Sequence, residues 1–314
     1  MVVDLLQVAA GVALLFFGGE VVVNSASALA RRLGLSPLVI GLTVVAFGTS
    51  SPELATTLTA GLQGSPDVAL GNVVGSNIAN IGLVLGVAAI LCPLVTHEVF
   101  LRREVPFMLA CSAGMLLVVR DGRIGRFEGL VMLVVLATYL WLLVRHERRH
   151  PEVPVDIEGT VPSATVPLWR SVLGVVAGLV LLSLGARSLI TGAVDLAIAL
   201  GVSERVVGLT VVAFGTSLPE LAATIVAARR KWADFILGSL IGSNIFNILF
   251  ILGTTSVVVP LTPNMTGVWI DLFVMCGFSL VIWPFLRLDM KMTRIEGAIL
   301  VAGYGAYIAW LFVR

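Results

Sequence analysis

Ten apolar segments account for most of this chain, and a lipid bilayer is the environment that suits them. A helix needs about 20 apolar residues to cross a bilayer. The chain is 58% hydrophobic and only 12% charged, with a mean hydropathy of +1.04, whereas a soluble chain is closer to half apolar and a quarter charged. The sequence therefore predicts an all-α polytopic membrane protein with ten transmembrane helices. We place them near residues 5–29, 37–62, 69–94, 104–119, 127–145, 168–194, 204–228, 235–260, 267–286 and 295–313.

Charge and cysteine content exclude several classes of protein. A net charge of +1 does not suggest a nucleic-acid partner. Cys92, Cys111 and Cys276 lie in apolar runs without metal-binding or redox spacing, so we interpret them as buried hydrophobic residues. The first segment carries an early acid, Asp4, and has no basic region or small-residue cleavage site. We expect it to be a retained helix and not a signal peptide.

The two halves of the chain are repeats. The stretch "GLTVVAFGTSSPELA" at 41–55 returns as "GLTVVAFGTSLPELA" at 208–222, a constant 167 positions later. Near the ends, "RFEGLVML" at 126 matches "RIEGAILV" at 294, and the offset grows to 168. We predict a first five-helix repeat over 1–146, a cytoplasmic linker over 147–166 and a second repeat over 167–314. Because five is odd, the second repeat must be inverted in the membrane, as in many transporters.

The basic residues orient the chain. One set of loops carries fourteen, which are Arg31, Arg32, Arg102, Arg103, Arg145, Arg148, Arg149, Arg170, Arg229, Arg230, Lys231, Arg287, Lys291 and Arg294. The opposite side carries five, which are Arg120, Arg123, Arg126, Arg205 and Arg314. The positive-inside rule places the first set in the cytoplasm. Both termini are then expected on the outer side. We expect the protein to lie in the cell (inner) membrane.

The repeated segment predicts a broken helix with an acid beside the break. Pro52 and Pro219 each lack an N–H, so the helices should bend or break near Gly48 and Gly215. A carbonyl freed inside a membrane needs a partner, and a cation is a suitable one. Oxygen groups around the breaks would provide an all-oxygen site for a hard cation such as Ca²⁺ or Na⁺. These groups belong to Thr49, Ser50, Glu53, Thr216, Ser217 and Glu220. A single intramembrane acid has a bland alternative as a structural hydrogen-bonding group, but a matched pair favours function.

The following segment of each half adds polar residues at helical spacing. Ser76 and Asn80 lie four residues apart, and so do Ser243 and Asn247. We expect them to coordinate ions, the alternative being interhelical hydrogen bonds. Asn77 and Asn244 point elsewhere, and we interpret them as structural. Paired glycines four residues apart indicate close helix packing; they are Gly71 and Gly75, and Gly238 and Gly242.

The paired "GTSSPEL" and "GTSLPEL", each followed by "GSNIxNI", resemble the two α-repeats of the cation/calcium exchanger family. The resemblance covers the whole ten-span plan. It implies a monomeric antiporter that exchanges Ca²⁺ for Na⁺ by alternating access, with these ions as its transported cargo and no organic cofactor. It also implies that Glu53 and Glu220 bind Ca²⁺ with oxygens of Thr49 and Thr216. Flanking Na⁺ sites would use Ser50, Ser76, Ser217, Ser243 and the carbonyls of Ala46 and Ala213, with Asn80 and Asn247 completing the centre.

The sequence departs from some relatives in ways that bear on coupling. Proton-coupled members carry an Asn-containing "GN..E" pattern where this chain has "GTS.PE", which favours Na⁺ over H⁺. Potassium-dependent members carry Asp at the position of Asn247, so we expect no K⁺ requirement. Glu20 in the first span corresponds to Arg187 in the sixth. These two residues either pair or face helix interfaces, and we expect a structural role.

Three alternatives stay open at this point. A proton/divalent-cation antiporter could use the same acid pair, a membrane-embedded enzyme could use it catalytically, and a channel could use it for selectivity. The symmetry of the two motifs argues against an enzyme, which would need an asymmetric site. Inverted repeats with broken helices suit a rocking transporter better than a static pore. The long first and sixth spans carry few polar residues and are candidates for the moving elements.

Overall fold

The computed structural model describes residues 1–149, 167–200, 215–265 and 267–313, and this part of the chain is mainly helical. The first half contains α1 (Val2–Leu33), α2 (Pro37–Ile40), η1 (Gly41–Val45), α3 (Ala46–Thr49), α4 (Ser51–Leu62), α5 (Pro66–Ala79), η2 (Asn80–Leu85), α6 (Gly86–Leu91), β1 (Leu94–Val95), α7 (Glu98–Val118) and α8 (Arg126–Arg149). The second contains α9 (Leu168–Ala199), α12 (Leu218–Arg229), α13 (Ala233–Phe246), η4 (Asn247–Leu252), α14 (Gly253–Val258), α15 (Val268–Asp289), β2 (Lys291–Met292) and α16 (Arg294–Val313). The η elements are π-helical turns. The predicted linker begins inside α8, which continues to Arg149, and its residues from 150 onward lie outside the described part.

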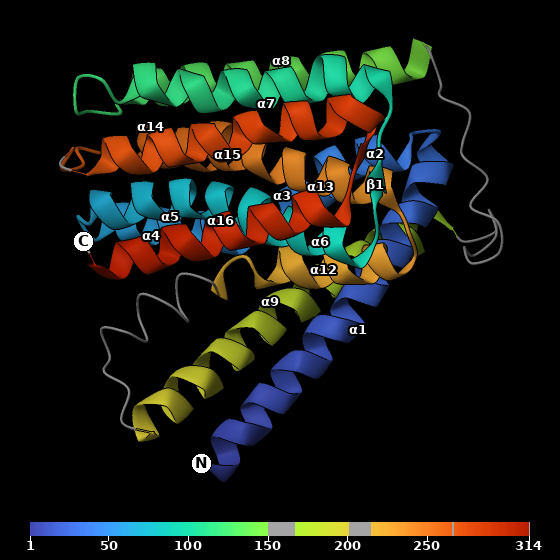
Figure 1. Cartoon of the computed structure of the whole chain (residues 1–314), viewed down its shortest axis with the longest axis horizontal. Helices are drawn as coiled ribbons and strands as arrows, with labels where there is room; N and C mark the ends of the chain where they lie inside the picture. The colour runs from blue at the N-terminus through green and yellow to red at the C-terminus, as the bar shows by residue number, and fades with distance from the viewer. Residues whose placement is uncertain (150–166, 201–214, 266, 314) are drawn as a thin grey trace.

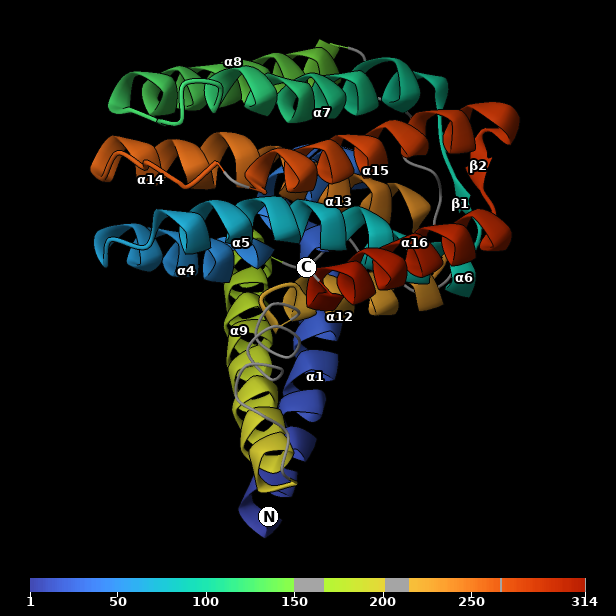
Figure 2. The same ribbon diagram turned by 60° about the vertical axis from the view of Figure 1, so that its left-hand side comes forward.

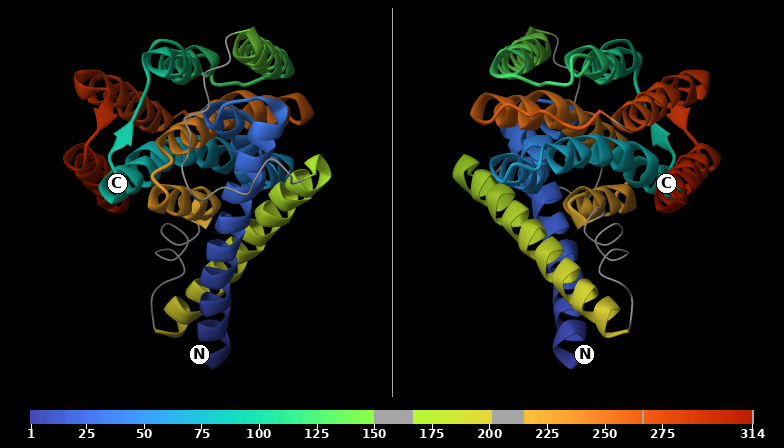
Figure 3. Two further views of the ribbon diagram at one scale, coloured as in Figure 1. Left: turned by 90° about the vertical axis from the view of Figure 1, so that its right-hand side faces the viewer. Right: turned by 90° about the vertical axis from the view of Figure 1, so that its left-hand side faces the viewer.

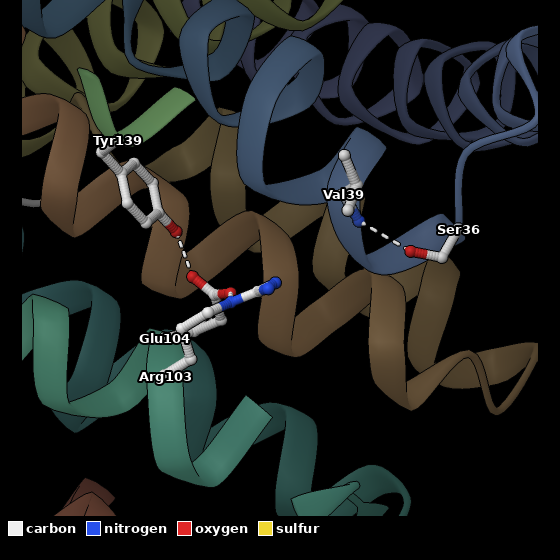
Figure 4. Close-up of polar contacts among 5 residues, drawn as sticks. All are labelled: Ser36, Val39, Arg103, Glu104 and Tyr139. Atoms are coloured by element: carbon white, nitrogen blue, oxygen red, sulfur yellow. Dashed lines mark hydrogen bonds and ion pairs between the residues drawn. The ribbon is translucent and has the colours of Figure 1, made fainter. Parts of the chain in front are cut away.

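Helix ends follow from local sequence signals. The Ser36 hydroxyl accepts from the Val39 N–H 3.3 Å away, and Pro37 follows at the first helical position, so α2 begins there (Figure 4). Thr293 and Glu296 form a reciprocal pair at the start of α16, in which the Glu296 carboxylate accepts from the Thr293 N–H at 2.6 Å. Gly34 ends α1 in the left-handed conformation.

Seven described helices are long and apolar enough to cross a bilayer, and the bent pair 37–49 and 51–62 would make an eighth. Two of the ten predicted spans are not among these eight. The span near 204–228 is described only in its second half, as α12. The span near 104–119 corresponds to α7, whose first turns carry Glu98, Arg102, Arg103 and Glu104. The count of ten therefore stays a prediction, while the polytopic helical architecture is confirmed.

The charged end of α7 is neutralised locally. Glu104 is fully buried, accepts a hydrogen bond from the Tyr139 hydroxyl on α8 and pairs with the neighbouring Arg103 (Figure 4). A buried charge without a partner is costly, so this network lets α7 carry an acid inside the bundle. No role for Glu104 was predicted from the sequence.

Two backbone pairings demonstrate the inversion of the repeats. β1 and β2 pair antiparallel, with Leu94 opposite Met292. A separate bridge joins Ile124 to Leu261. Leu261 is the repeat partner of Leu94, and Met292 is that of Ile124, at the offsets of 167 and 168 found in the sequence. The two pairings are therefore the same contact made twice, at opposite ends of the helix bundle (Figure 1).

The helices α1 and α9 cross in close contact and project away from the remaining helices (Figures 2 and 3). Glycines make this approach possible. A Cβ at Gly18 would lie 2.8 Å from the Leu182 backbone nitrogen, and one at Gly185 would lie 2.8 Å from that of Leu15. Gly18 and Gly185 are repeat partners, so this crossing also obeys the pseudo-two-fold symmetry. The sequence predicted long first and sixth spans but not their glycine contact.

Candidate functional site

The first broken helix places its acid in the centre of the molecule. α3 ends at Thr49, Ser50 leaves the helical conformation with φ −81° and ψ 5°, and α4 begins at Ser51 with Pro52 in its first turn. The two parts are bent by 44°. The break that was predicted near Gly48 thus falls two residues later. Glu53 lies in the first turn of α4 and is only 1% exposed.

The described part of the second repeat positions its acid in the same way. Ser217 has φ −87° and ψ 5°, α12 begins at Leu218, and Glu220 lies in its first turn, 3% exposed. Residues 201–214, which include Ala213, are outside the described part. The predicted carbonyl ligand of Ala213 therefore has no structural description, whereas its counterpart Ala46 is buried at the start of α3.

The two acids are neighbours across the pseudo-two-fold axis. The Ser50 hydroxyl donates to Glu220 Oε1 at 3.5 Å, which joins the first broken helix to the acid of the second. Thr49 Oγ1 lies 3.5 Å from Ser243 Oγ and 3.5 Å from the carbonyl of Ala46. The structure thus brings together residues that are 170 and 194 positions apart in the chain.

The flanking helices supply the rest of the candidate site. Ser76 and Asn80 lie at the end of α5 and the start of η2, and Ser243 and Asn247 lie at the end of α13 and the start of η4. All four are buried. Asn80 Nδ2 donates to Asn244 Oδ1 at 3.4 Å, so Asn244 connects to the candidate site from the opposite repeat. Asn77 donates to the Val73 carbonyl on its own helix, in keeping with a structural role.

The π-helical turns are a feature that the sequence reasoning missed. η2 begins at Asn80 and η4 begins at Asn247, which are repeat partners. A π-turn displaces side chains relative to an α-helix and often occurs at functional sites. Here it begins at a buried asparagine of the candidate site in each half. No residue type in "NIGLVL" or "NILFIL" marks such a turn, so sequence alone offered no signal for it.

Many polar atoms of this cluster have no hydrogen-bond partner among the described residues. Buried polar atoms are normally paired, so such a concentration requires an explanation. These atoms are Glu53 Oε2, Glu220 Oε2, Asn80 Oδ1, Asn247 Oδ1, Asn247 Nδ2, Thr216 Oγ1 and Ser217 Oγ. All but one are oxygens that can face a hard cation. The donor set therefore fits Ca²⁺ or Na⁺ as cargo.

The predicted glycine faces have mixed outcomes. A Cβ at Gly238 would lie 2.4 Å from the Leu38 carbonyl oxygen, and one at Gly242 would lie 2.8 Å from Leu42, so α13 packs closely on the first half of the broken helix. This packing is confirmed. Gly71 and Gly75 on α5 have no described atom within 4 Å of a Cβ. By the repeat, their partner would come from 201–214, which lies outside the described residues.

The two predicted residues of spans one and six are in different settings. Glu20 pairs with Arg230, just after α12, and not with Arg187, and Asn24 accepts from the same guanidinium. Arg187 lies exposed on α9. Glu20 therefore faces a helix interface, which is the second of the two possibilities considered for it, and does not pair with Arg187.

A broken helix in the first repeat and the matching start of α12 in the inverted second repeat meet around buried acids, which is typical of secondary ion transporters. Comparison with known proteins leads to the same class. The family model described as sodium/calcium exchanger protein matches residues 3–145 and 170–313. The chain belongs to the sodium/calcium exchanger family.

Individual relatives cover almost the full chain. The sodium/calcium exchanger MaX1 of Methanosarcina acetivorans is 32% identical, over 99% of both chains. The inner membrane protein YrbG of Escherichia coli is 35% identical, over 96% of this chain and 94% of its own. A solved structure of the sodium-calcium exchanger NCX_Mj, soaked with Na⁺ and Sr²⁺, superposes with a TM-score of 0.84 at 32% identity and covers 98% of both chains.

Proposed function

We propose that this protein is an antiporter that exchanges Ca²⁺ for Na⁺ across the cell membrane by alternating access. The observation that carries the proposal is the group of buried oxygens without hydrogen-bond partners around Glu53 and Glu220. Membership of the exchanger family and the similarity to MaX1, which is named a sodium/calcium exchanger, support the same ions.

The roles of the site residues follow from their charge. Glu53 and Glu220 would bind Ca²⁺ together with Thr49 and Thr216, because a +2 ion neutralises both carboxylates. The Na⁺ positions would be formed by Ser50, Ser76, Ser217, Ser243 and the carbonyls of Ala46 and Ala213, with Asn80 and Asn247 completing the centre. Na⁺ must bind in several copies to give the same neutralisation.

Obligatory exchange is the consequence of this electrostatics. An empty site with two buried negative charges is costly to carry through an occluded state, whereas a loaded site is neutral or nearly so. The loaded forms should therefore cross and the empty form should not. The moving elements would be α1 and α9, which pack on each other and lie outside the site helices.

The membrane arrangement forms part of the proposal. It has ten spans in two five-helix units joined by the linker near 147–166, with both termini outside and the protein acting as a monomer. The basic residues of the loops support this orientation.

Transport in purified proteoliposomes tests the proposed ions. We expect ⁴⁵Ca²⁺ uptake to be driven by an outward Na⁺ gradient and not by a K⁺ or H⁺ gradient alone. Uptake that a pH gradient drives without Na⁺ would favour the alternative proton/divalent-cation antiporter with the same acid pair. Absence of uptake under all three gradients, in vesicles that contain folded protein, would overturn both.

A further inference from the structure

Arg230, just after α12, joins the end of that helix to α1. Its guanidinium pairs with the carboxylate of Glu20 and also donates to the side-chain oxygen of Asn24, one helical turn away. The helices touch closely at this point, because a Cβ at Gly19 would lie 3.0 Å from Val226 Cγ2. α1 is thereby fixed to the helix that carries Glu220.

The repeat-equivalent contact is not made. The offset of 167 relates Glu20 to Arg187 and Arg230 to Gln63, and both Arg187 and Gln63 are exposed. Within the described residues, α9 makes no contact with α4 as extensive as that of α1 with α12. The repeats are thus symmetric in sequence but asymmetric in packing here.

Such an asymmetry is what distinguishes the two access states of an inverted-repeat transporter. The two halves exchange roles between the states, so a contact made by one half in the first state is made by the other half in the second. In the present structure α1 covers α12, on the side that the basic residues place in the cytoplasm, and α4 lacks the corresponding cover from α9. This corresponds to a state closed inside.

We propose that Glu20, Asn24 and Arg230 form an inner latch, and that Arg187 and Gln63 form the corresponding outer latch when the halves exchange roles. The inference rests on the proposed alternating access, and it adds the residues that set the balance between the two states. Chemical complementarity supports the unseen contact, because a guanidinium donates readily to the side-chain oxygen of glutamine.

The two latches differ in strength. The inner latch is a charge-assisted contact of Arg230 with a carboxylate and with a second acceptor, whereas the outer latch would pair Arg187 with a neutral amide. A partly exposed ion pair shifts an equilibrium by about two- to fivefold. Compared with a protein whose two latches are equally strong, this protein should therefore populate the state closed inside about two- to fivefold more. Because that state does not bind ions from the cytoplasm, the apparent affinity for a cytoplasmic ion is lowered.

A disulfide reporter placed beside the latch residues tests the outer latch. Ala186 and Thr59 are the repeat partners of Gly19 and Val226, so Ala186→Cys with Thr59→Cys should cross-link only when α9 packs on α4. The background carries Ala in place of Cys92, Cys111 and Cys276. Glu20→Gln weakens the inner latch, and Gln63→Glu strengthens the outer one. Each should raise the cross-linking rate in proteoliposomes by about two- to fivefold.

A matched control removes an ion pair of the same type elsewhere. Glu98 and Arg102 form an exposed pair 2.5 Å apart on α7, away from α1 and α12, so Glu98→Gln should leave the rate unchanged. If Glu20→Gln and Gln63→Glu both behave like this control, the latch proposal is overturned. If Glu20→Gln fails to fold by size-exclusion chromatography, Gln63→Glu alone decides, since it leaves the inner latch intact. Cross-linking is measured with Na⁺ and Ca²⁺ present, because only loaded forms are expected to cross, and ⁴⁵Ca²⁺ uptake by the parent tests the exchange function separately.

Discussion

At the scale of single residues, the centre of the molecule combines two acids with neutral oxygen groups. Glu53 and Glu220 are buried in the first turns of α4 and α12, and each leaves one carboxylate oxygen without a hydrogen-bond partner among the described residues. Two carboxylates match the charge of one Ca²⁺, while the hydroxyls and amides add ligands without adding charge. Charge and shape at this centre can therefore be changed separately.

Neutralising either acid should abolish exchange without unfolding the protein. Glu53→Gln and Glu220→Gln keep the shape of the side chain but remove one negative charge. The +2 charge of a bound Ca²⁺ is then no longer fully neutralised. We expect Na⁺-driven ⁴⁵Ca²⁺ uptake to fall to the level of empty vesicles. The thermal stability in ion-free buffer should be maintained or raised, because a neutral amide replaces a carboxylate in a buried site. Glu98→Gln, on the exposed part of α7, is the control. Near-normal uptake in either site variant would contradict the site assignment.

A third acid at Asn247 should change the ion requirement. Neither polar atom of the Asn247 side chain has a hydrogen-bond partner among the described residues. In Asn247→Asp the site gains a negative charge that must be neutralised by a proton or by an additional cation. We expect Ca²⁺ exchange that K⁺ stimulates or that becomes newly dependent on pH, with neither effect in the parent. The measurement is Na⁺-driven flux with and without K⁺ between pH 6 and 9. Identical K⁺ and pH profiles of the parent and the variant would mean that Asn247 is a helix-packing residue and not part of the ion site.

At the scale of helices, the sequence predicted the breaks but not the turns and contacts that accompany them. Pro52 and Pro219 have a direct backbone effect, since each removes an N–H and blocks a helical hydrogen bond. The π-turns at Asn80 and Asn247 depend on how a whole helix accommodates its neighbours, so a short motif does not encode them. The same holds for Glu20, whose partner Arg230 is 210 residues away and comes from the other repeat.

The α1–α9 crossing should be sensitive to the smallest added side chain. A Cβ at Gly18 would lie 2.8 Å from the Leu182 nitrogen and 3.1 Å from the Gly178 oxygen, and neither backbone atom can move alone. Gly18→Ala should therefore separate the helices, lower the free energy of unfolding by about 1–3 kcal/mol and slow exchange. Gly114→Ala on α7 is the control, because no described atom lies within 4 Å of its Cβ. Thermal melting and ⁴⁵Ca²⁺ uptake measure the two effects, and equal behaviour of both variants would refute the close contact.

At the scale of the whole molecule, one contact lies on the pseudo-two-fold axis. Ser112 on α7 and Ser279 on α15 are repeat partners, 167 positions apart, and their hydroxyl oxygens lie 3.2 Å apart in the buried interior. Two equivalent residues can touch only where the axis passes between them. The constant offset predicted that such an axis exists, but it could not predict which pair of residues lies on it, because that depends on three-dimensional packing.

A disulfide at this position should leave transport intact. Ser112→Cys with Ser279→Cys, in a background with Ala at Cys92, Cys111 and Cys276, should cross-link α7 to α15. If α1 and α9 are the moving elements, these two helices belong to the stationary part and the oxidised protein should keep most of its Ca²⁺ uptake. The same protein after reduction is the control. A large and reversible loss of uptake on oxidation would show that α7 and α15 also move.

The serine pair has a further consequence for how such a chain could have arisen. In a dimer of one five-helix protein with two-fold symmetry, the residue at this position faces its own copy in the partner subunit, as in any isologous interface. Serine suits that place, because one hydroxyl can donate while its twin accepts. After gene duplication and fusion the two copies are free to diverge. A change to an acid at one of the two serines would bury an unpaired charge between the halves. The residues that are tolerated at one position therefore depend on the residue at the other.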